Sequence, residues 1–376
     1  MNHDVYINGL GVYLPGSPVA SSDMEDYLGQ VNGTPSKNRA FILRQNKIKT
    51  RHYAIDKNGN TTNSSVKMST EAIQEALKNS ECSQKDITYL ASSSTLGDQL
   101  VPGLASQIHG NLNIPPIEIA NFNSVCASSL MAIKSAWLQL KTDEHKCAAV
   151  SGCELASRYF RPGFYEGTDE INEDGKLSME ADFLRFTLSD GAGAAILENR
   201  PNTNQRSLKI NWIDLRSYAD RFDNCMTAGY ITKDHEKIRY WSEYETLEDS
   251  FKAGSFILKQ DFSLMQKMIQ VWVAHYLDLI DQGKIIVDKV DHLCSHYSSH
   301  SLRKDAIKIL KKTGSMISED KWFTNLYTKG NTGTASIFII LEELFRTKDL
   351  QPGQKILCHV PESGRCVNGF MMLEVV

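Results

Sequence analysis

The order of strand-like and helix-like segments in the first half of this chain is repeated in its second half. Apolar runs of strand length alternate with longer amphipathic runs, which predicts an α/β fold with helices packed on sheets. The run around Leu90 aligns with the run around Leu293, which lies 203 positions later. Cys126 and Asn331, each at the start of a helix-like run rich in small residues, are 205 positions apart. Two matches at nearly one offset predict an internal duplication, in which both helix starts converge at the centre between the halves.

The duplication predicts two halves, residues 1–200 and 201–376, with an insertion at 216–256. The insertion interrupts the alternation with aromatic and charged residues, so we expect it to cover a site and not to form a domain. Residues 21–62 are polar and irregular. Strands are predicted at 6–14, 87–93, 117–121, 147–152, 192–197, 208–215, 290–296, 355–360 and 370–376. Helices are predicted at 68–78, 127–140, 265–280, 300–311 and 332–345.

The composition is that of an ordinary globular protein. Apolar residues make up 41% and charged residues 23% of the chain, and the net charge of −4 offers no basic surface for nucleic acid. No apolar run approaches the ~18 residues of a membrane span, and the first residues lack a signal-peptide pattern. The eight cysteines are scattered without a C-x-x-C pair, which argues against a zinc site or a disulfide framework. We therefore expect a cytoplasmic protein that binds no nucleic acid, no membrane and no metal.

Cys126 lies where a predicted strand gives way to a helix. Backbone N–H groups and the helix dipole at such a position favour a thiolate and lower the pKa of the thiol. This placement makes Cys126 a candidate nucleophile for covalent acyl transfer. Taken alone, a cysteine is more often a buried structural residue; the histidine and the asparagine described next change that balance.

His296 ends a predicted strand, and Asn331 lies between Gly330 and Gly333. An imidazole and a side-chain amide at these element ends can both donate hydrogen bonds to the oxygen of a thioester as it gains negative charge. The alternatives are a polar loop histidine and an asparagine that only accommodates a turn. His300 lies one helical turn further on, and we prefer His296 because it ends the strand directly.

Together these segments resemble the ketoacyl-acyl carrier protein synthase III branch of the thiolase superfamily. The resemblance rests on Val-Cys-Ala-Ser-Ser at 125–129, Ser-Asp-Gly-Ala-Gly-Ala at 189–194, the strand-end His296 and Gly-Asn-Thr at 330–332. It covers nearly the whole chain and implies a five-layered αβαβα fold made of two duplicated halves. It also implies a homodimer without a cofactor and a Cys126–His296–Asn331 triad. Cys126 would take an acyl group from coenzyme A or from an acyl carrier protein, and a carbanion would then attack that thioester.

Two departures from the fatty-acid enzymes of this family point to a subgroup. Tyr-Ser-Ser follows His296 in place of Gln-Ala-Asn, and Pro-Glu-Ser-Gly-Arg at 361–365 replaces a glycine-rich loop. This tail is similar to that of bacterial enzymes that make dialkylresorcinol and isopropylstilbene rings. Those enzymes join two acyl chains, one of them a β-ketoacyl chain, and cyclise the product to a cyclohexanedione. The expected function is therefore condensation with cyclisation; the alternatives are decarboxylative condensation with malonyl-acyl carrier protein and acyl transfer to oxygen or nitrogen.

The resemblance also implies further site residues. In this family the backbone N–H groups of the nucleophile and of the tail loop form the oxyanion hole, which places Cys126 and Gly364 in that role. Condensation without decarboxylation needs a base, and Glu154 and Glu362 are candidates, although most carboxylates are solvent-facing or ion-paired. Arg365 could position a carbonyl or carboxylate group of the substrate, or it could form a structural ion pair.

Overall fold

The structure is a computed structural model that describes residues 3–233 and 237–376. Met1 and Asn2, the first residues of the stretch that lacks a signal-peptide pattern, lie outside the described residues, as do residues 234–236 of the predicted insertion. Among the helices described, none is both long enough and apolar enough to cross a membrane.

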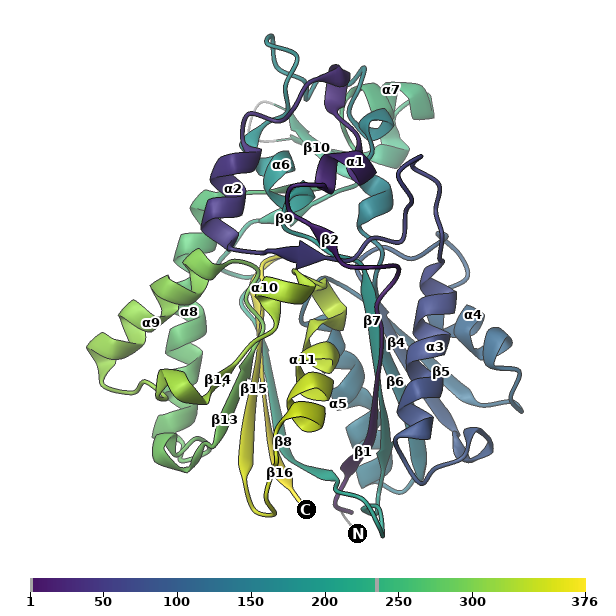
Figure 1. Cartoon of the computed structure of the whole chain (residues 1–376), viewed down its shortest axis with the longest axis vertical. Helices are drawn as coiled ribbons and strands as arrows, with labels where there is room; N and C mark the ends of the chain where they lie inside the picture. Colours follow the sequence, from purple (N-terminus) through teal and green to yellow (C-terminus); the bar gives the residue numbers. More distant parts are fainter. Residues whose placement is uncertain (1–2, 234–236) are drawn as a thin grey trace.

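A ten-stranded mixed sheet forms the framework, in the order β14-β13-β15-β16-β8-β1-β7-β6-β4-β5 (Figure 1). The strands are β1 (Tyr6–Tyr13), β4 (Tyr89–Ser94), β5 (Glu118–Asn123), β6 (Cys147–Glu154), β7 (Gly191–Glu198), β8 (Leu208–Ser217), β13 (His292–Ser295), β14 (Trp322–Phe323), β15 (Lys355–Glu362) and β16 (Val367–Val375). The two halves of this sheet meet in its middle, where β1 pairs with β8 over only two residue pairs, Tyr6 with Lys209 and Ile7 with Leu208. This short junction divides the framework into two five-stranded halves.

The two halves have one topology. The order β5-β4-β6-β7-β1 in the first half corresponds to β14-β13-β15-β16-β8 in the second. In each half the first two pairings are parallel and the last two are antiparallel. The duplicated architecture expected from the sequence is therefore confirmed, with β4 and β13 at corresponding places.

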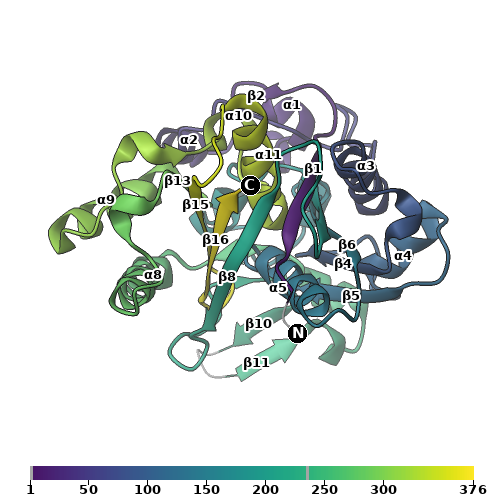
Figure 2. The same cartoon turned by 90° about the horizontal axis from the view of Figure 1, so that it is seen from below.

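Helices complete five layers (Figure 2). The central layer consists of α5 (Ser128–Lys141) and α11 (Ser336–Thr347), each of which contacts strands of both halves. One outer layer, on the first half, is formed by α3 (Ser65–Lys78) and α4 (Leu104–Leu112). The other outer layer, on the second half, is formed by α8 (Phe262–Asp281) and α9 (His300–Thr313). The starts of α5 and α11 are buried between the two halves of the sheet, and the small residues at 127–129 and 333–336 suit this narrow space.

The remaining elements gather at one end of the layers, at the top of Figure 1. They come from the segment before α3, from the segment between β6 and β7, from the predicted insertion and the residues just after it, and from residues 326–329. Their bounds are β2 (Val19–Ala20), α1 (Met24–Leu28), α2 (Arg39–Asn46), β3 (Thr50–Arg51), α6 (Met179–Arg185), β9 (Met226–Thr227), β10 (Tyr230–Lys233), β11 (Lys237–Tyr240), α7 (Leu247–Lys252), β12 (Lys259–Gln260) and α10 (Leu326–Lys329). An apolar cluster joins α1, α2 and α6 to residues that flank β12, so this cap is packed together and onto the layers.

Candidate active site

Cys126 lies in the tight turn that leads from β5 into α5. The turn is closed by the Ser128 N–H, which donates to the Val125 carbonyl at 3.0 Å, and by the Ser129 hydroxyl, which donates to the Cys126 carbonyl at 2.8 Å. The cysteine side chain is 9% exposed and lines a cavity between the two halves of the molecule. The Cys126 thiol thus lies in a cavity that is lined by residues of both halves.

His296 follows the last residue of β13 and faces the same cavity. Its backbone N–H continues the ladder to β15 by donating to the His359 carbonyl at 2.8 Å, which fixes the direction of the side chain. Burial lowers the pKa of His296 to about 4, so the imidazole is neutral near pH 7. His300, the alternative, lies at the start of α9 with its Nδ1 2.7 Å from the Tyr327 hydroxyl, and it is not among the residues that line the cavity.

Asn331 is held at the start of the second central helix by backbone and side-chain bonds. Its carbonyl accepts from the Ser189 N–H at 2.8 Å, and its Oδ1 accepts from the Gly333 N–H at 3.0 Å. Since Oδ1 is used in this way, the amide presents Nδ2 as its donor. The positive φ angles of this turn, +74° and +51°, fall on Gly330 and Gly333. Asn331 lines the cavity. Its own φ angle is not positive, so it is not the residue that takes the left-handed conformation in this turn.

Glu154 reaches the cavity from the end of β6 with its two oxygens in different surroundings. Oε1 accepts three hydrogen bonds, from the Thr95 N–H at 3.2 Å, the Thr95 hydroxyl at 2.6 Å and the Thr334 N–H at 3.3 Å. Among the described residues, no donor is recorded for Oε2. Burial raises the pKa of Glu154 to about 7 although these donors lower it. The carboxyl group is thus anchored through one oxygen and titrates near neutral pH.

Glu362, at the end of β15, is engaged through both oxygens. Oε1 accepts from the Ser124 hydroxyl at 2.8 Å, and Oε2 accepts from the Ala127 N–H at 3.1 Å. Burial again raises the pKa of the group to about 7. Glu362 does not line the cavity but holds the turn that carries Cys126, so it positions the nucleophile.

The predicted lowering of the Cys126 pKa is wrong. Burial, followed by the charges of Glu362 and Glu154, raises the pKa of the thiol well above its usual value. The Ala127 N–H, which would favour a thiolate, already donates to Glu362. This N–H is therefore not available to stabilise a negative charge on the Cys126 sulfur. Formation of the thiolate therefore depends on a proton acceptor in the cavity.

The remaining two candidates, Gly364 and Arg365, are not among the residues that line the cavity. Gly364 packs against Val125, next to the nucleophile: a methyl group at Gly364 would come within 2.9 Å of the Val125 side chain. Arg365 is exposed, and its Nε donates to the Phe222 carbonyl at 2.8 Å. The structure thus brings together Cys126, His296, Asn331 and Glu154 and leaves Arg365 outside the cavity lining.

The rest of the lining is largely apolar and comes from parts of the sequence that carried no site motif. The cap contributes Leu184, Leu188, Met226 and Leu258, and α8 and α9 contribute Met265, Ile269, Trp272, Val273, Tyr276, Leu302, Arg303, Ala306 and Leu310. Met226 belongs to the predicted insertion, which agrees with its expected place over a site. Ser295 and His359 also line the cavity and were missed; the period of two along a strand, which puts His359 on one face with Leu357 and Pro361, is the sequence signal for His359.

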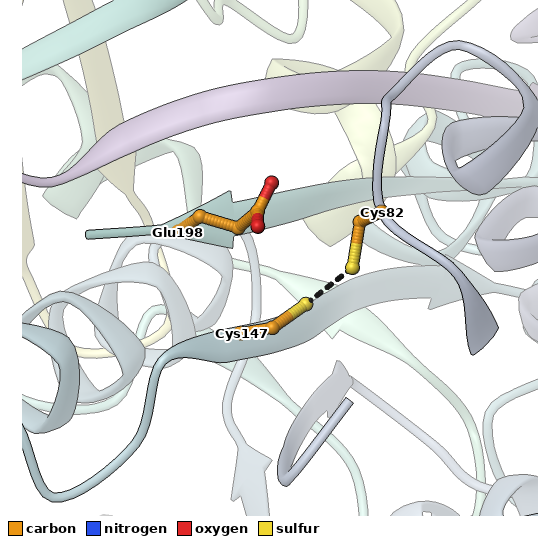
Figure 3. Close-up of side chains that lie close together, drawn as sticks. All are labelled: Cys82, Cys147 and Glu198. Atoms are coloured by element: carbon orange, nitrogen blue, oxygen red, sulfur yellow. Dashed lines mark hydrogen bonds between the residues drawn. The ribbon is translucent and has the colours of Figure 1, made fainter. Parts of the chain in front are cut away.

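One group of side chains has metal-binding composition and lies away from this cavity. The ligand atoms of Cys82, Cys147 and Glu198 lie within 4.8 Å of one another, and the two sulfurs are 2.7 Å apart (Figure 3). The contact with Cys82, followed by burial, raises the pKa of Cys147, which keeps it a thiol. Glu198 Oε2 already accepts from Asn8 Nδ2 at 2.6 Å. With Cys147 held as a thiol and Glu198 already accepting a hydrogen bond, the group fits a packed cysteine pair better than a metal site.

Family models match both halves of the chain. The thiolase N-terminal domain matches residues 48–164, and the C-terminal domain of 3-oxoacyl-[acyl-carrier-protein] synthase III matches residues 280–364. The beta-ketoacyl-[acyl-carrier-protein] synthase III of Clostridium acetobutylicum is 22% identical over 94% of each chain. The enzyme of the same name from Oleidesulfovibrio alaskensis is 23% identical over 94% of this chain and 93% of its own.

Solved structures share the fold at low sequence identity. AbyA1, described as a tetronic acid condensing enzyme, superposes with a TM-score of 0.77 and 17% identity over 98% of this chain and 99% of its own. A variant of Xanthomonas campestris OleA, solved with lauric acid and lauroyl-CoA, has a TM-score of 0.73 and 18% identity over 100% of both chains. The expected thiolase-like fold is therefore confirmed.

Proposed function

We propose a specific reaction for this chain, which is a ketosynthase III-type acyltransferase of the thiolase superfamily: it joins two acyl thioesters through an acyl-Cys126 intermediate and cyclises the product. One substrate is an enoyl or aryl-enoyl thioester, the other is a β-ketoacyl thioester, and the product is a cyclohexanedione. The observation that carries the proposal is the arrangement of Glu154, whose free Oε2 shares one cavity with the three triad residues. Such a product is a precursor of resorcinol or stilbene rings.

The first half-reaction loads Cys126. Its sulfur attacks the carbonyl carbon of an acyl thioester, the new carbon–sulfur bond forms, and the thiol of coenzyme A or of the carrier protein leaves. The neutral imidazole of His296 is the acceptor for the thiol proton, which Cys126 needs because its own pKa is raised. The N–H groups of Cys126 and Gly364 are proposed to stabilise the oxyanion of this step.

The second half-reaction makes the carbon–carbon bond. Glu154 Oε2 takes the proton from the carbon between the two carbonyls of the β-ketoacyl thioester, and the carbanion attacks acyl-Cys126, whose sulfur leaves. Asn331 Nδ2 and His296 donate to the enolate oxygen that forms. A group with a pKa of about 7 suits this role, because a general base works best when its pKa is near the working pH. A second, intramolecular attack then closes the six-membered ring: carbon 4 of the former β-ketoacyl chain adds to carbon 3 of the enoyl chain, and the proton lost from carbon 4 is balanced by one gained at carbon 2 of the enoyl chain, so that no group leaves.

Glu362 is the weaker of the two candidate bases. Both of its oxygens accept hydrogen bonds from the turn around Cys126, and its carboxyl group does not face the cavity. We assign it a positioning role. Arg365 is assigned no role in binding substrate, because its side chain is exposed and bonded to a carbonyl of the insertion.

Decarboxylative condensation is the second candidate, and the names of the curated relatives favour it. Those relatives are beta-ketoacyl-[acyl-carrier-protein] synthases III. In that reaction loss of carbon dioxide from a malonyl thioester supplies the carbanion, and no base for an α-proton is needed. Acyl transfer to oxygen or nitrogen is a third candidate without a feature in this cavity that selects it.

We further propose a cytoplasmic homodimer that uses acyl-CoA or acyl carrier protein substrates and no cofactor. Strand β5 is an unpaired edge of the ten-stranded sheet, and apolar side chains are exposed near it: Ile119 at 37%, Leu138 at 49%, Leu100 at 84% and Val101 at 81%. An edge with apolar neighbours pairs readily with a second copy. The division into halves at residue 200 stays a prediction.

Product analysis tests the proposal. The enzyme is incubated with an enoyl-CoA and, in parallel, with a β-ketoacyl thioester, a malonyl thioester, or an alcohol or amine acceptor, and products are identified by mass spectrometry. We expect a cyclic 1,3-dione from the β-ketoacyl reaction without malonate. Linear β-ketoacyl products that form only with malonyl thioester would replace this reaction with the decarboxylative one, and esters or amides would replace it with simple acyl transfer.

A further inference from the structure

The part of the cavity between the second-half sheet and helices α8 and α9 is lined by two polar residues of strands β13 and β15, whose other cavity-lining residues are apolar. Ser295 of β13 and His359 of β15 are opposite each other in the parallel ladder. The other cavity-lining residues of these two strands are Leu293, Leu357 and Pro361. We call this part of the cavity the C-terminal arm.

Ser295 and His359 are the inner end of a hydrogen-bonded chain that runs outward through the sheet. The Ser295 hydroxyl is 3.0 Å from His359 Nδ1, and His359 Nε2 is 2.8 Å from Asn368 Oδ1. The chain continues from Asn368 Nδ2 to His275 Nδ1 at 3.1 Å and from His275 Nε2 to Asp214 Oδ1 at 3.0 Å.

The outer end of this chain sets the direction of every bond in it. Burial would raise the pKa of Asp214, but hydrogen bonds from Lys284, His275 and Arg216 outweigh it and lower the pKa to about 2. An ionised carboxylate only accepts, so His275 donates through Nε2 and, being neutral, must accept at Nδ1. Burial lowers the pKa of His275, which keeps it neutral.

Asn368 transmits this direction to the cavity. Its Nδ2 faces two acceptors, His275 Nδ1 and the Trp272 carbonyl at 3.4 Å, so the amide cannot be turned over. Its Oδ1 then accepts from Nε2–H of His359, whose Nδ1 is left to accept from the Ser295 hydroxyl. The His359 ring is also fixed by stacking on Phe370, with centroids 4.4 Å apart and an interplanar angle of 12°.

Towards the cavity, the pair of Ser295 and His359 can therefore accept hydrogen bonds but cannot donate them. The only hydrogen of the Ser295 hydroxyl is committed to His359, and both ring nitrogens of His359 are committed in turn. What Ser295 offers to the cavity is the lone pairs of its oxygen. Ser295 directly precedes His296, with Cα atoms ~3.8 Å apart, and both residues line this cavity.

We propose that Ser295 is a specificity-determining acceptor, fixed by the chain from Asp214, for an acyl thioester with an O–H group at carbon 3. The O–H group is a hydroxyl; a ketone oxygen or a plain methylene gains nothing there. The inference rests on the proposed function only in taking acyl thioesters as the ligands. It adds to that function a preference for a chain that is hydroxylated at carbon 3.

The direction of the chain can be tested without any substrate. In protein labelled with ¹⁵N-histidine, two-bond ¹⁵N–¹H spectra at pH 7 separate the two neutral tautomers, and the signals that vanish in His359→Phe identify His359. We expect His359 to carry its proton on Nε2. A proton on Nδ1 would mean that Ser295 can donate to the cavity, and the inference would fall.

Binding tests the specificity. Calorimetry in a Cys126→Ala background compares 3-hydroxydodecanoyl-CoA with dodecanoyl-CoA, so that no condensation is required. We expect the hydroxylated chain to bind roughly two- to tenfold more tightly, the range of one hydrogen bond. Ser295→Ala should remove the preference, and Ser298→Ala, a second serine of the cavity lining, should keep it.

The binding results test the role of Ser295 separately from the proposed condensation reaction. Equal binding of the two ligands, or a preference that survives Ser295→Ala, overturns it even if the enzyme makes the expected dione. An equal loss of affinity for both ligands in Ser295→Ala would show that the oxygen accepts from the shared coenzyme A portion, which also overturns it. Retained preference with no condensation in the wild type would leave the inference standing and refute the reaction.

Discussion

Glu154→Gln separates the proposed base from the rest of the site. All three hydrogen bonds to Glu154 end on Oε1, so a glutamine can keep them through its own Oε1 while its Nε2 replaces the free oxygen in the cavity. The variant should fold and should still be acylated at Cys126. Condensation should fall by about 10²–10⁴-fold, the usual contribution of a general base.

The same substitution has a calculable effect on stability. The pKa of Glu154 is about 7 in the folded protein against an ordinary value of 4.5, a difference that corresponds to about 3 kcal/mol. Because the folded pKa is the higher one, wild-type stability from this group is complete below pH 4.5 and is lost as the pH rises through 7. The glutamine does not ionise. The free energy of unfolding of the variant should therefore be close to that of the wild type near pH 5 and should exceed it by up to about 3 kcal/mol near pH 8.5.

Denaturant unfolding of both proteins at pH 5 and pH 8.5 measures this difference. The matched comparison is Glu362→Gln, whose carboxyl pKa is also about 7: it should show the same pH-dependent gain, because the amide N–H₂ can donate to the Ser124 hydroxyl while the amide oxygen accepts from the Ala127 N–H. A stability difference for Glu154→Gln that does not change with pH would refute the buried titration. Normal condensation by this variant would refute Glu154 as the base.

Three further predictions concern the nucleophile, the donors and the cysteine pair. Acyl-CoA should add one acyl group to the peptide that contains Cys126, and Cys126→Ala should abolish it; labelling of another cysteine with Cys126 untouched would contradict the assignment. His296→Ala and Asn331→Ala should keep the melting temperature within a few degrees and slow condensation about 100- to 1,000-fold, whereas normal turnover of Asn331→Ala would make it a turn residue. A chelator should leave the melting temperature unchanged, since Cys82 and Cys147 form a packed cysteine pair; a marked drop in the melting temperature would reveal a bound metal.

The layered core was predictable because its strands and helices carry strong apolar periodicity. The run predicted as a strand at 147–152 is β6 (Cys147–Glu154), and the helix predicted at 265–280 is α8 (Phe262–Asp281). The elements of the cap were missed because contacts between residues far apart in the sequence stabilise them, both apolar and polar. Arg39 of α2, for example, pairs with Glu25 at 2.7 Å and donates to carbonyls of Ser21 and Ser22, which no local pattern reveals.

The positions of the site residues could be predicted where the ends of helices and strands determine them. Their chemical properties could not, because these depend on neighbours that are distant in the sequence. The placement of Cys126 and Asn331 follows from the small-residue starts of two central helices. The direction of the Cys126 pKa could not be inferred, because Glu362, which contacts the neighbouring N–H, lies 235 positions from Ala127. The role of His359 likewise depends on Asn368 and His275, which come from two other elements.

A single-turnover chase tests the central claim most directly. Enzyme loaded with a ¹³C-labelled acyl group on Cys126, and freed of excess donor, is mixed with an unlabelled β-ketoacyl thioester, and both protein and products are followed by mass spectrometry. The account predicts that the label leaves Cys126 at the rate at which a carbon–carbon-bonded cyclic product that contains it appears. Release of the label as free acid, or its retention on Cys126 while product forms, would contradict an acyl-Cys126 intermediate in condensation.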